Sequence, residues 1–386
     1  MITLHQSPTD PAFVQNPYPF YAGARAHGPL FHWHDYAMPC TTTHAATNAI
    51  LRDRRFGREP VDALPVPDHL KPFYNVEAHS MLELEPPRHT RLRGLVLRAF
   101  TNHRIKELAP EITQLTHDLI DRFPENHDLL ETFARPLPVT IIARLLGVPE
   151  DMAPDLLRWS NAMVMMYQAG RTRADEDVAV AATEEFVAFM RDYVERKRRD
   201  PQDDLITALI AAEEDGAKLS TDELITTCIL LLNAGHEATV HSIGNGMKLC
   251  LEDGHRPPAD PAKFTEELLR IDPPLHMFTR TAYEEVEVHG HTFQRGDQVA
   301  LLLGAANRDP EVYPDPDTFL PDRSGPAQLA FGAGLHFCVG APLARLELQI
   351  ALPILFQRCP DLALTAVPQY ADIYHFHGLD ALMVRS

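Results

Sequence analysis

One cysteine in a glycine-rich loop limits the fold of this 386-residue chain more than any other feature. Cys338 lies among three glycines, Gly332, Gly334 and Gly340, directly before a segment with the composition of a helix. Glycines let a backbone approach a flat cofactor closely. Amides at the start of a helix favour the thiolate form of a nearby sulfur. A buried structural cysteine is the alternative, but the fixed offsets of the glycines and His336 favour a metal-bound thiolate.

The segment resembles the haem-binding loop of the cytochromes P450, which reads Phe-x-x-Gly-x-His/Arg-x-Cys-x-Gly. Every specified position matches: Phe331, Gly334, His336, Cys338 and Gly340. The resemblance implies a haem b cofactor whose iron takes Cys338 as its axial thiolate, with Phe331, Gly332 and Gly340 beside it. A thiolate ligand favours cleavage of the O–O bond. The match covers most of the chain, and it implies a single mainly α domain over residues 1–386 with a small β region.

Bulk properties exclude several other classes of protein. Hydrophobic residues make up 45% of the chain and charged residues 23%, which is ordinary for a globular protein. A net charge of −19 disfavours binding to nucleic acid. The five cysteines form no CxxC pair, so we expect neither a zinc finger nor a disulfide framework. No run approaches the roughly 20 apolar residues that cross a bilayer. We therefore expect a cytoplasmic monomer that binds no membrane.

Helical patterns dominate the chain. Ser220 and Glu223 form a capping box, and the apolar pattern that follows predicts a helix to about residue 251. A long amphipathic helix is predicted over 174–199. Shorter helices are predicted over 17–26, 43–53, 261–271 and 341–357, a hairpin over 30–42, strands near 286–288 and 299–303, and an irregular, proline-rich stretch over 56–86.

Glu267 and Arg270 lie one helical turn apart and can pair on the same face. An isolated pair of this kind is usually a weak surface contact. With Arg323 further along the chain, the order resembles the Glu–Arg–Arg network of the P450 family. The resemblance implies a structural role, in which the three residues hold the segment that leads to the cysteine loop.

Four cationic side chains match the positions that bind the haem propionates in this family. His89 and Arg93 are four residues apart at the start of a predicted helix. Arg280 and His336 match the two other contacts. Each residue alone would be weak evidence, because the chain has 20 histidines, but beside the cysteine loop the set favours haem binding.

The long central helix carries the family's pattern for oxygen activation, with one departure. Small residues, Ala234 and Gly235, would let a ligand approach the backbone, and Glu237 matches the acid of the acid–alcohol pair that relays protons to dioxygen. The alcohol position holds Ala238, and Thr239 is turned about 100° away. Protonation would then need a substrate hydroxyl or a water held by Glu237. A zinc motif with His236 and His241 is excluded by their spacing of five residues.

Positions relative to these motifs predict the substrate pocket. They are Leu230 and Asn233 on the long helix, Leu275, His276 and Phe278 before Arg280, and Met81 in the proline-rich stretch. Core packing is the alternative for the apolar members. Polar groups in an apolar cavity usually orient a ligand, so Asn233 and His276 favour a mid-sized, mainly apolar substrate that carries an oxygen or nitrogen function.

Residues 88–106 contain six Lys or Arg and no Asp or Glu. A solvated basic helix is an equal alternative, but the stretch could dock an acidic iron–sulfur ferredoxin or a flavodoxin as electron donor.

The resulting hypothesis is a haem-thiolate monooxygenase that inserts one atom of dioxygen into an organic substrate. Altered chemistry (peroxide use, oxidative coupling or rearrangement) is the first alternative because of Ala238. A non-catalytic haem sensor is the second.

Overall fold

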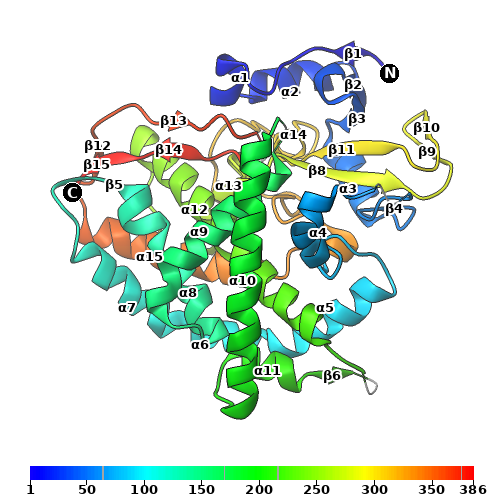
Figure 1. Ribbon diagram of the computed structural model, residues 1–386. Helices are drawn as coiled ribbons and strands as arrows, with labels where there is room; N and C mark the ends of the chain where they lie inside the picture. Colours follow the sequence, from blue (N-terminus) through cyan, green and yellow to red (C-terminus); the bar gives the residue numbers. More distant parts are fainter. Residues whose placement is uncertain (63–64, 169, 215–216, 375) are drawn as a thin grey trace.

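The computed structural model describes residues 1–62, 65–168, 170–214, 217–374 and 376–386. Helices form most of it, as the sequence predicted (Figure 1). The α-helices are α1 (Pro11–Gln15), α2 (Tyr18–Arg25), α3 (His44–Arg52), α4 (Lys71–Glu77), α5 (Arg88–Ala99), α6 (Asn102–Glu107), α7 (Ala109–Ile120), α8 (Pro136–Leu146), α9 (Ala153–Val164), α10 (Arg173–Arg199), α11 (Leu205–Ala211), α12 (Thr221–Asp253), α13 (Ala262–Ile271), α14 (Leu303–Ala306) and α15 (Ala341–Arg358). Shorter turns are η1 (His34–Tyr36), η2 (Asp68–Leu70), η3 (Leu130–Ala134), η4 (Glu150–Met152), η5 (Met165–Tyr167) and η6 (Gly334–His336).

The β region is small. Its main sheet lies on one side of the helices, and the short strands β5, β12, β13, β14 and β15 lie on the other (Figure 1). The main sheet has the order β1-β2-β3-β11-β8-β4 and mixes parallel and antiparallel pairs. Strand β8 pairs antiparallel with β11, with Arg280 opposite Val299. The strands are β1 (Thr3–Leu4), β2 (Leu30–Trp33), β3 (Met38–Thr41), β4 (Phe56–Gly57), β5 (Asn126–Asp128), β6 (Glu213–Glu214), β7 (Ala217–Lys218), β8 (Met277–Ala282), β9 (Val286–Val288), β10 (His291–Phe293), β11 (Gln298–Leu302), β12 (Ala363–Leu364), β13 (Gln369–Tyr370), β14 (Leu379–Ala381) and β15 (Met383–Arg385).

The predicted capping box is confirmed at the start of α12. The Ser220 hydroxyl accepts from the backbone N–H of Glu223 at 3.2 Å, and the Glu223 carboxylate accepts from the N–H of Ser220 at 2.9 Å. These bonds satisfy two N–H groups that a helix start otherwise leaves unpaired. The helix spans 33 residues and packs against α8, α10 and η3.

Some local predictions are wrong. The stretch 56–86, predicted to be irregular, contains β4 and α4. Asn16 ends α1 rather than capping the next helix, and Pro17 precedes α2 without a side-chain cap. Residues near the C-terminus form short strands, of which β15 pairs with β5, far away in the sequence. Strands of two or three residues carry too little periodicity to be predicted.

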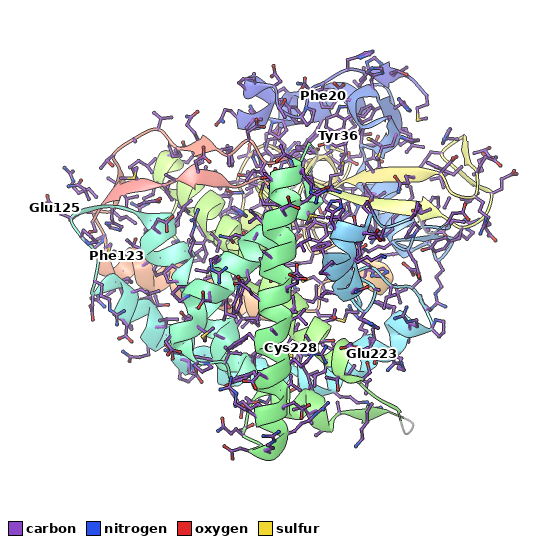
Figure 2. The ribbon with its side chains drawn as sticks, in the orientation of Figure 1. Phe20, Tyr36, Phe123, Glu125, Glu223 and Cys228 are labelled. Atoms are coloured by element: carbon purple, nitrogen blue, oxygen red, sulfur yellow. The ribbon has the colours of Figure 1, made fainter. Side chains whose placement is uncertain are left out.

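The core has one large part and two smaller ones. The large cluster fills the space between α7, α8, α10, α12 and α15. A second cluster lies beneath the sheet, and a third, largely aromatic cluster joins α1 and α2 to β2, with Phe20 and Tyr36 at that end of the molecule (Figure 2). No helix in the described part of the chain is long and apolar enough to cross a membrane.

Glu347 is a buried acid in the middle of α15. Its side chain is fully buried, and neither carboxyl oxygen has a hydrogen-bond partner among the described residues. Burial raises its pKa well above the ordinary value. In the unfolded chain this carboxyl loses its proton near pH ~4.3. Above that pH the folded state keeps a proton that the unfolded state releases, so the stability of the fold falls as the pH rises.

Glu347→Gln should therefore stabilise the protein at about pH 8, and the gain should shrink toward about pH 5 as the unfolded carboxyl regains its proton. Thermal melts of both proteins across this range measure the difference. The matched control is Glu125→Gln, which changes an exposed carboxylate and should give no such trend. A gain that stayed constant with pH would contradict the protonated, buried state of Glu347.

Candidate functional site

The cysteine loop, residues 331–340, is a closed turn that contains η6 and runs directly into α15. The backbone N–H of Cys338 donates to the carbonyl oxygen of Phe331 at 3.0 Å, which joins the two ends of the loop. Gly334 has φ of +69°, and a Cβ there would collide with the carbonyl oxygen of Leu51. Only glycine tolerates both the conformation and the contact. The backbone of α3 therefore fixes the position of the loop.

The sulfur of Cys338 lies in surroundings that suit a metal-bound thiolate. The residue is partly buried, and burial raises the pKa of its thiol. The amides of Gly340 and Ala341 hydrogen-bond to the sulfur and oppose this effect, as do the positive charges of Arg93 and Arg345. The two amides and the two positive charges thus favour negative charge on the sulfur. A metal ion facing the sulfur would complete the stabilisation of the thiolate.

His89 and His336, two predicted propionate ligands, lie together. Their ring centroids are 4.4 Å apart. His336 Nε2 lies 2.8 Å from Glu85 Oε1, whereas neither ring nitrogen of His89 has a partner among the described residues, although the side chain is buried. Burial lowers the pKa of His89 to about 4, so this imidazole is neutral. A neutral imidazole has one N–H to donate to an anionic oxygen.

Arg280 is a buried cation. Its side chain is only 3% exposed, and its recorded hydrogen bond goes to the carbonyl oxygen of Thr279 at 2.8 Å. Among the described residues, Arg280 forms no ion pair. Burial and the nearby charge of Arg58 lower its pKa to about 10. A buried guanidinium without a carboxylate is costly, so Arg280 and the orphaned His89 fit the two propionates of a haem.

Arg93 contacts the cysteine loop directly. Its guanidinium donates to the carbonyl oxygen of Phe337 at 2.7 Å. The predicted cationic group and the cysteine loop are thus linked through α5 in the folded chain. The residues present fit a haem with a thiolate ligand.

The middle of α12 is more open than the buried segments on either side of it, residues 223–229 and 242–247. Ala234 is exposed although the helix lies deep in the molecule, and Gly235 and Glu237 are partly exposed. Ala238 is also partly exposed, while Thr239 is buried. The turn of the helix thus directs Thr239 into the core. Ser242, one turn further on, donates its hydroxyl to the carbonyl oxygen of Ala238 at 2.8 Å and is already engaged.

Glu237 is surrounded by polar groups that the sequence analysis did not assign to it. His236 Nε2 lies 3.4 Å from one carboxylate oxygen, and His241 Nε2 lies 3.6 Å from the other. The amide of Asn161, oriented by its hydrogen-bond network, donates to Glu237 from α9. Burial raises the pKa of Glu237, but the contact with His236 and the charges of His241 and Arg135 outweigh it and hold the pKa below its ordinary value.

Both histidines therefore support an ionised Glu237. Burial lowers the pKa of His241 to about 4. Although both imidazoles approach the carboxylate, the three side chains do not form a metal-ligand cluster within the described part of the chain.

The six residues predicted for the substrate pocket do not stay together. Leu230 and Met81 border the large core cluster. The Asn233 amide nitrogen contacts the sulfur of Met163 at 3.6 Å, and its oxygen has no partner in the described structure. Leu275 forms an isolated β-bridge with Phe376.

Two of these residues lie elsewhere. The ring of Phe278 packs against Gly332 of the cysteine loop. His276 is 0% exposed and hydrogen-bonds with Tyr21 at 3.0 Å. Its imidazole therefore belongs to a buried polar cluster near α2 rather than to an open pocket. Its short distance in sequence from Arg280 gave no information about the direction of its side chain.

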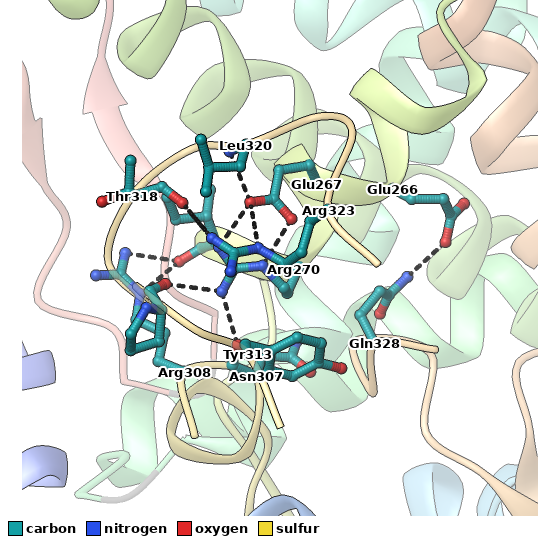
Figure 3. A network of polar contacts seen from close by, with 12 residues as sticks. Glu266, Glu267, Arg270, Asn307, Arg308, Tyr313, Thr318, Leu320, Arg323 and Gln328 are labelled. Carbon is teal, nitrogen blue, oxygen red and sulfur yellow. Dashed lines mark hydrogen bonds and ion pairs between the residues drawn. The ribbon is translucent and has the colours of Figure 1, made fainter. Parts of the chain in front are cut away.

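The predicted Glu–Arg–Arg network is present as ion pairs (Figure 3). Arg270 binds both carboxylate oxygens of Glu267, at 2.7 and 2.8 Å, and Arg323 binds one of them at 3.1 Å. The Leu320 N–H donates to the same carboxylate at 2.9 Å. The Arg270 side chain also donates to the carbonyl oxygens of Asn307, Pro316 and Thr318.

A second link, which the sequence did not suggest, joins α13 to the cysteine loop. Arg345 of α15 binds both oxygens of Glu266, at 2.5 and 3.0 Å. Its guanidinium also lies 4.6 Å from the ring centroid of Phe331. The segment between α14 and η6 is thus held at both ends by ionic contacts.

The basic stretch 88–106 is partly used within the molecule. Arg91 pairs with Glu223, and Arg104 pairs with Asp203 at 3.0 Å. Arg88 donates to the carbonyl oxygen of Ala78 at 2.9 Å. These contacts reduce, but do not remove, the positive charge available on this surface.

Comparisons with known proteins agree with this arrangement. The family described as Cytochrome P450 matches residues 20–254 and 262–364. The monooxygenase PikC of Streptomyces venezuelae is 38% identical over 397 residues, which cover 97% of this chain and 92% of that protein. The 6-deoxyerythronolide B hydroxylase of Saccharopolyspora erythraea is also 38% identical, over 84% of this chain and 83% of that protein.

A solved structure is also similar. The crystal structure of P450BioI with an acyl carrier protein ligated to hexadec-9Z-enoic acid matches with a TM-score of 0.93 and 33% identity. The match covers 98% of this chain and all of the other. It confirms the predicted fold, which is mainly helical with a small β region. With its cysteine loop, its Glu–Arg–Arg network and matches over nearly its whole length, the chain belongs to the cytochrome P450 family.

Proposed function

We propose that this P450 hydroxylates a mid-sized, mainly apolar substrate that itself carries a hydroxyl group, and that this hydroxyl replaces the alcohol missing at Ala238. Membership of the family makes the chain a haem-thiolate monooxygenase that acts on an organic molecule. The observation that carries the finer proposal is the surroundings of Ala238 on α12. A proton donor is needed there, and of the two alcohols that follow it on the helix, Thr239 is buried and Ser242 is engaged.

The haem supplies the oxidising chemistry, and the protein supplies binding, orientation and protons. Cys338 would hold the iron, and Phe331, Gly332 and Gly340 would line the thiolate side. His89, Arg93, Arg280 and His336 would hold the propionates. Ala234 and Gly235 would leave space above the haem. These residues would belong to a single domain that acts in the cytoplasm.

The proton route rests on Glu237. Its ionised carboxylate, held between His236 and His241, can accept a hydrogen bond from a water or from a substrate hydroxyl. Ala238 offers no hydroxyl, Thr239 is buried, and Ser242 is engaged with a carbonyl oxygen. The last donor must then come from the substrate or from a water that the substrate holds. One relative is named as a hydroxylase of 6-deoxyerythronolide B, and a substrate of this kind would agree with the proposal.

Electrons would come from a separate ferredoxin or flavodoxin. Residues 88–106 supply positive charge close to Arg93 and the cysteine loop. Complementary charge mainly raises the rate of encounter between partners. An acidic donor of this kind should therefore reduce the enzyme more slowly as the salt concentration rises.

Ala238→Thr tests the substrate-assisted route. A positioned proton donor is worth roughly 10²–10⁴-fold in rate, so the added hydroxyl should raise coupling severalfold for substrates without a hydroxyl. Substrates with one should change little. Product formed per NADH consumed, with hydrogen peroxide measured in parallel, gives the coupling. The matched control is Ala234→Ser, which adds a hydroxyl one helical turn away from the alcohol position.

Tight coupling of the wild-type enzyme with a substrate that lacks a hydroxyl would overturn the proposal. The alternative that Ala238 leaves is a peroxide-using enzyme, or one that couples or rearranges its substrate. Turnover with hydrogen peroxide, without reductant, at the rate of the NADH-driven reaction would support that alternative. A stably haem-loaded protein that turns over no substrate with any reductant would be a sensor.

A further inference from the structure

A second cluster of metal-ligating side chains lies outside the haem site. It consists of Asp272, which ends α13, His276, which precedes β8, and His377, which precedes β14. His276 is 0% exposed and His377 is 6% exposed. The three residues are thus brought together by the fold from two distant parts of the chain, in the interior.

Their geometry is close to that of a tetrahedral site. One ligand atom from each residue lies within 4.8 Å of the other two, and His377 Nε2 lies 3.5 Å from Asp272 Oδ1. Zinc bonds of about 2.0–2.1 Å place neighbouring ligand atoms about 3.4 Å apart. The Asp272–His377 pair already has this spacing. The rings of His276 and His377 have centroids only 4.4 Å apart, so a small rotation of His276 completes the set.

Tyrosine hydroxyls surround the three ligands as supports. Tyr18 and Tyr370 each donate to one oxygen of Asp272, both at 2.5 Å. Tyr21 lies 3.0 Å from His276 Nδ1, and Tyr18 lies 3.4 Å from its Nε2. A cation at Nε2 would therefore take the place of the longer contact with Tyr18. An ionised carboxylate has about four lone-pair sites, so two remain on Asp272. Hydrogen bonds of this kind typically orient metal ligands from outside.

The charges also suit a divalent cation. Asp272 brings a carboxylate to the cluster, and a neutral imidazole offers one ring nitrogen with a free lone pair. Two cations lie near the cluster. The guanidinium of Arg308 is 3.3 Å from the ring centroid of Tyr18. Lys248 lies 5.4 Å from the ring centroid of Tyr370, which stacks on His377, and pairs with Glu252 at 2.8 Å. Asp317 pairs with Arg308 at 3.0 Å and offsets it.

A cavity lies beside the cluster. It has a volume of about 270 Å³ and is lined by Tyr18, Tyr21, Arg308 and Asp317, among others. Tyr18 and Tyr21 both contact His276, so these two side chains separate the cavity from the imidazole. Water in this cavity could supply the fourth ligand.

We propose that Asp272, His276 and His377 bind a divalent cation of the zinc type, at a site separate from the haem. Two imidazoles and one carboxylate are donors that zinc prefers. The ion would join the end of α13 to the C-terminal segment. Leu275 and Phe376, each adjacent to a ligand, form a β-bridge, and Phe376 lies beside the ring of His241. The ion would thus stiffen the backbone next to the histidines of Glu237. This site does not depend on the substrate proposed above.

The test uses tag-free holoprotein, dialysed against a chelator and then titrated with Zn²⁺. Elemental analysis should find one zinc per chain in addition to haem iron, with a Kd below roughly 1 μM, and the melting temperature should rise and saturate at one equivalent. His377→Gln should abolish both the binding of zinc and the rise in melting temperature. Tyr370→Phe, which removes only a supporting hydroxyl, should weaken Zn²⁺ binding about 10–100-fold.

The matched control is His103→Gln, which removes an exposed histidine that pairs with Glu107 and should leave binding unchanged. X-ray absorption at the zinc edge of the wild-type protein provides a measurement that does not depend on how a variant folds. It should show two imidazole ligands. Absence of zinc at one equivalent, a zinc site without imidazole, or full binding by a folded His377→Gln protein would each overturn the proposal.

Discussion

Cys338→Ala should abolish substrate oxidation and remove the Soret band of the reduced, carbon-monoxide-bound protein that is typical of thiolate-ligated haem. The thiolate is what favours O–O cleavage in this family, and alanine offers the iron no ligand. Haem should still associate weakly, because Arg93, Arg280 and the two histidines remain in place. Difference spectra of the reduced protein with and without carbon monoxide, together with product analysis, measure both effects.

Cys359→Ala is the matched control. Cys359 also lies at an end of α15 and is partly buried, but it is at the far end of the helix from the cysteine loop. This variant should keep the band and the activity of the wild-type enzyme. If Cys338→Ala retained the band, another residue would be the ligand, and the assignment drawn from the loop would fail.

The parts of the fold that the sequence predicts well are those fixed by neighbouring residues. The start of α12 follows from Ser220 and Glu223 three residues later, and the long helices α10 and α12 follow from sustained periodicity. The cysteine loop is likewise a local pattern. The Glu267–Arg270 pair is local too, and Arg323 could be added only through resemblance to a family.

The parts that could not be predicted depend on contacts between distant segments. Asn161 reaches Glu237 from α9, and no pattern along α12 indicates it. The sequence analysis assigns His276 to the pocket from its short separation from Arg280, but His276 lies just before β8 and its side chain follows contacts with distant segments. Its partners Tyr21 and His377 are more than 100 residues away on one side or the other. The pairing of β5 with β15 has the same cause.

Glu267→Gln should destabilise the protein strongly and reduce its haem content. Glu267 is 4% exposed and Arg270 is 2% exposed, and the carboxylate accepts from Arg270, Arg323 and the backbone of Leu320. Glutamine keeps the size of the side chain but leaves two guanidinium groups without a counter-charge. Removal of one partner from a buried ion pair typically costs about 3–5 kcal/mol, a large fraction of the stability of a domain.

Urea denaturation should show a lower midpoint for Glu267→Gln, and the ratio of haem absorbance to protein should fall because the segment before the cysteine loop loses its anchor. Glu266→Gln is the matched control, since the adjacent carboxylate pairs with Arg345 in a more exposed position. Exposed pairs contribute only about 0–1 kcal/mol, so Glu266→Gln should lower the stability several times less than Glu267→Gln. Equal effects of the two substitutions would show that burial of the Glu267 network is not what holds the cysteine loop.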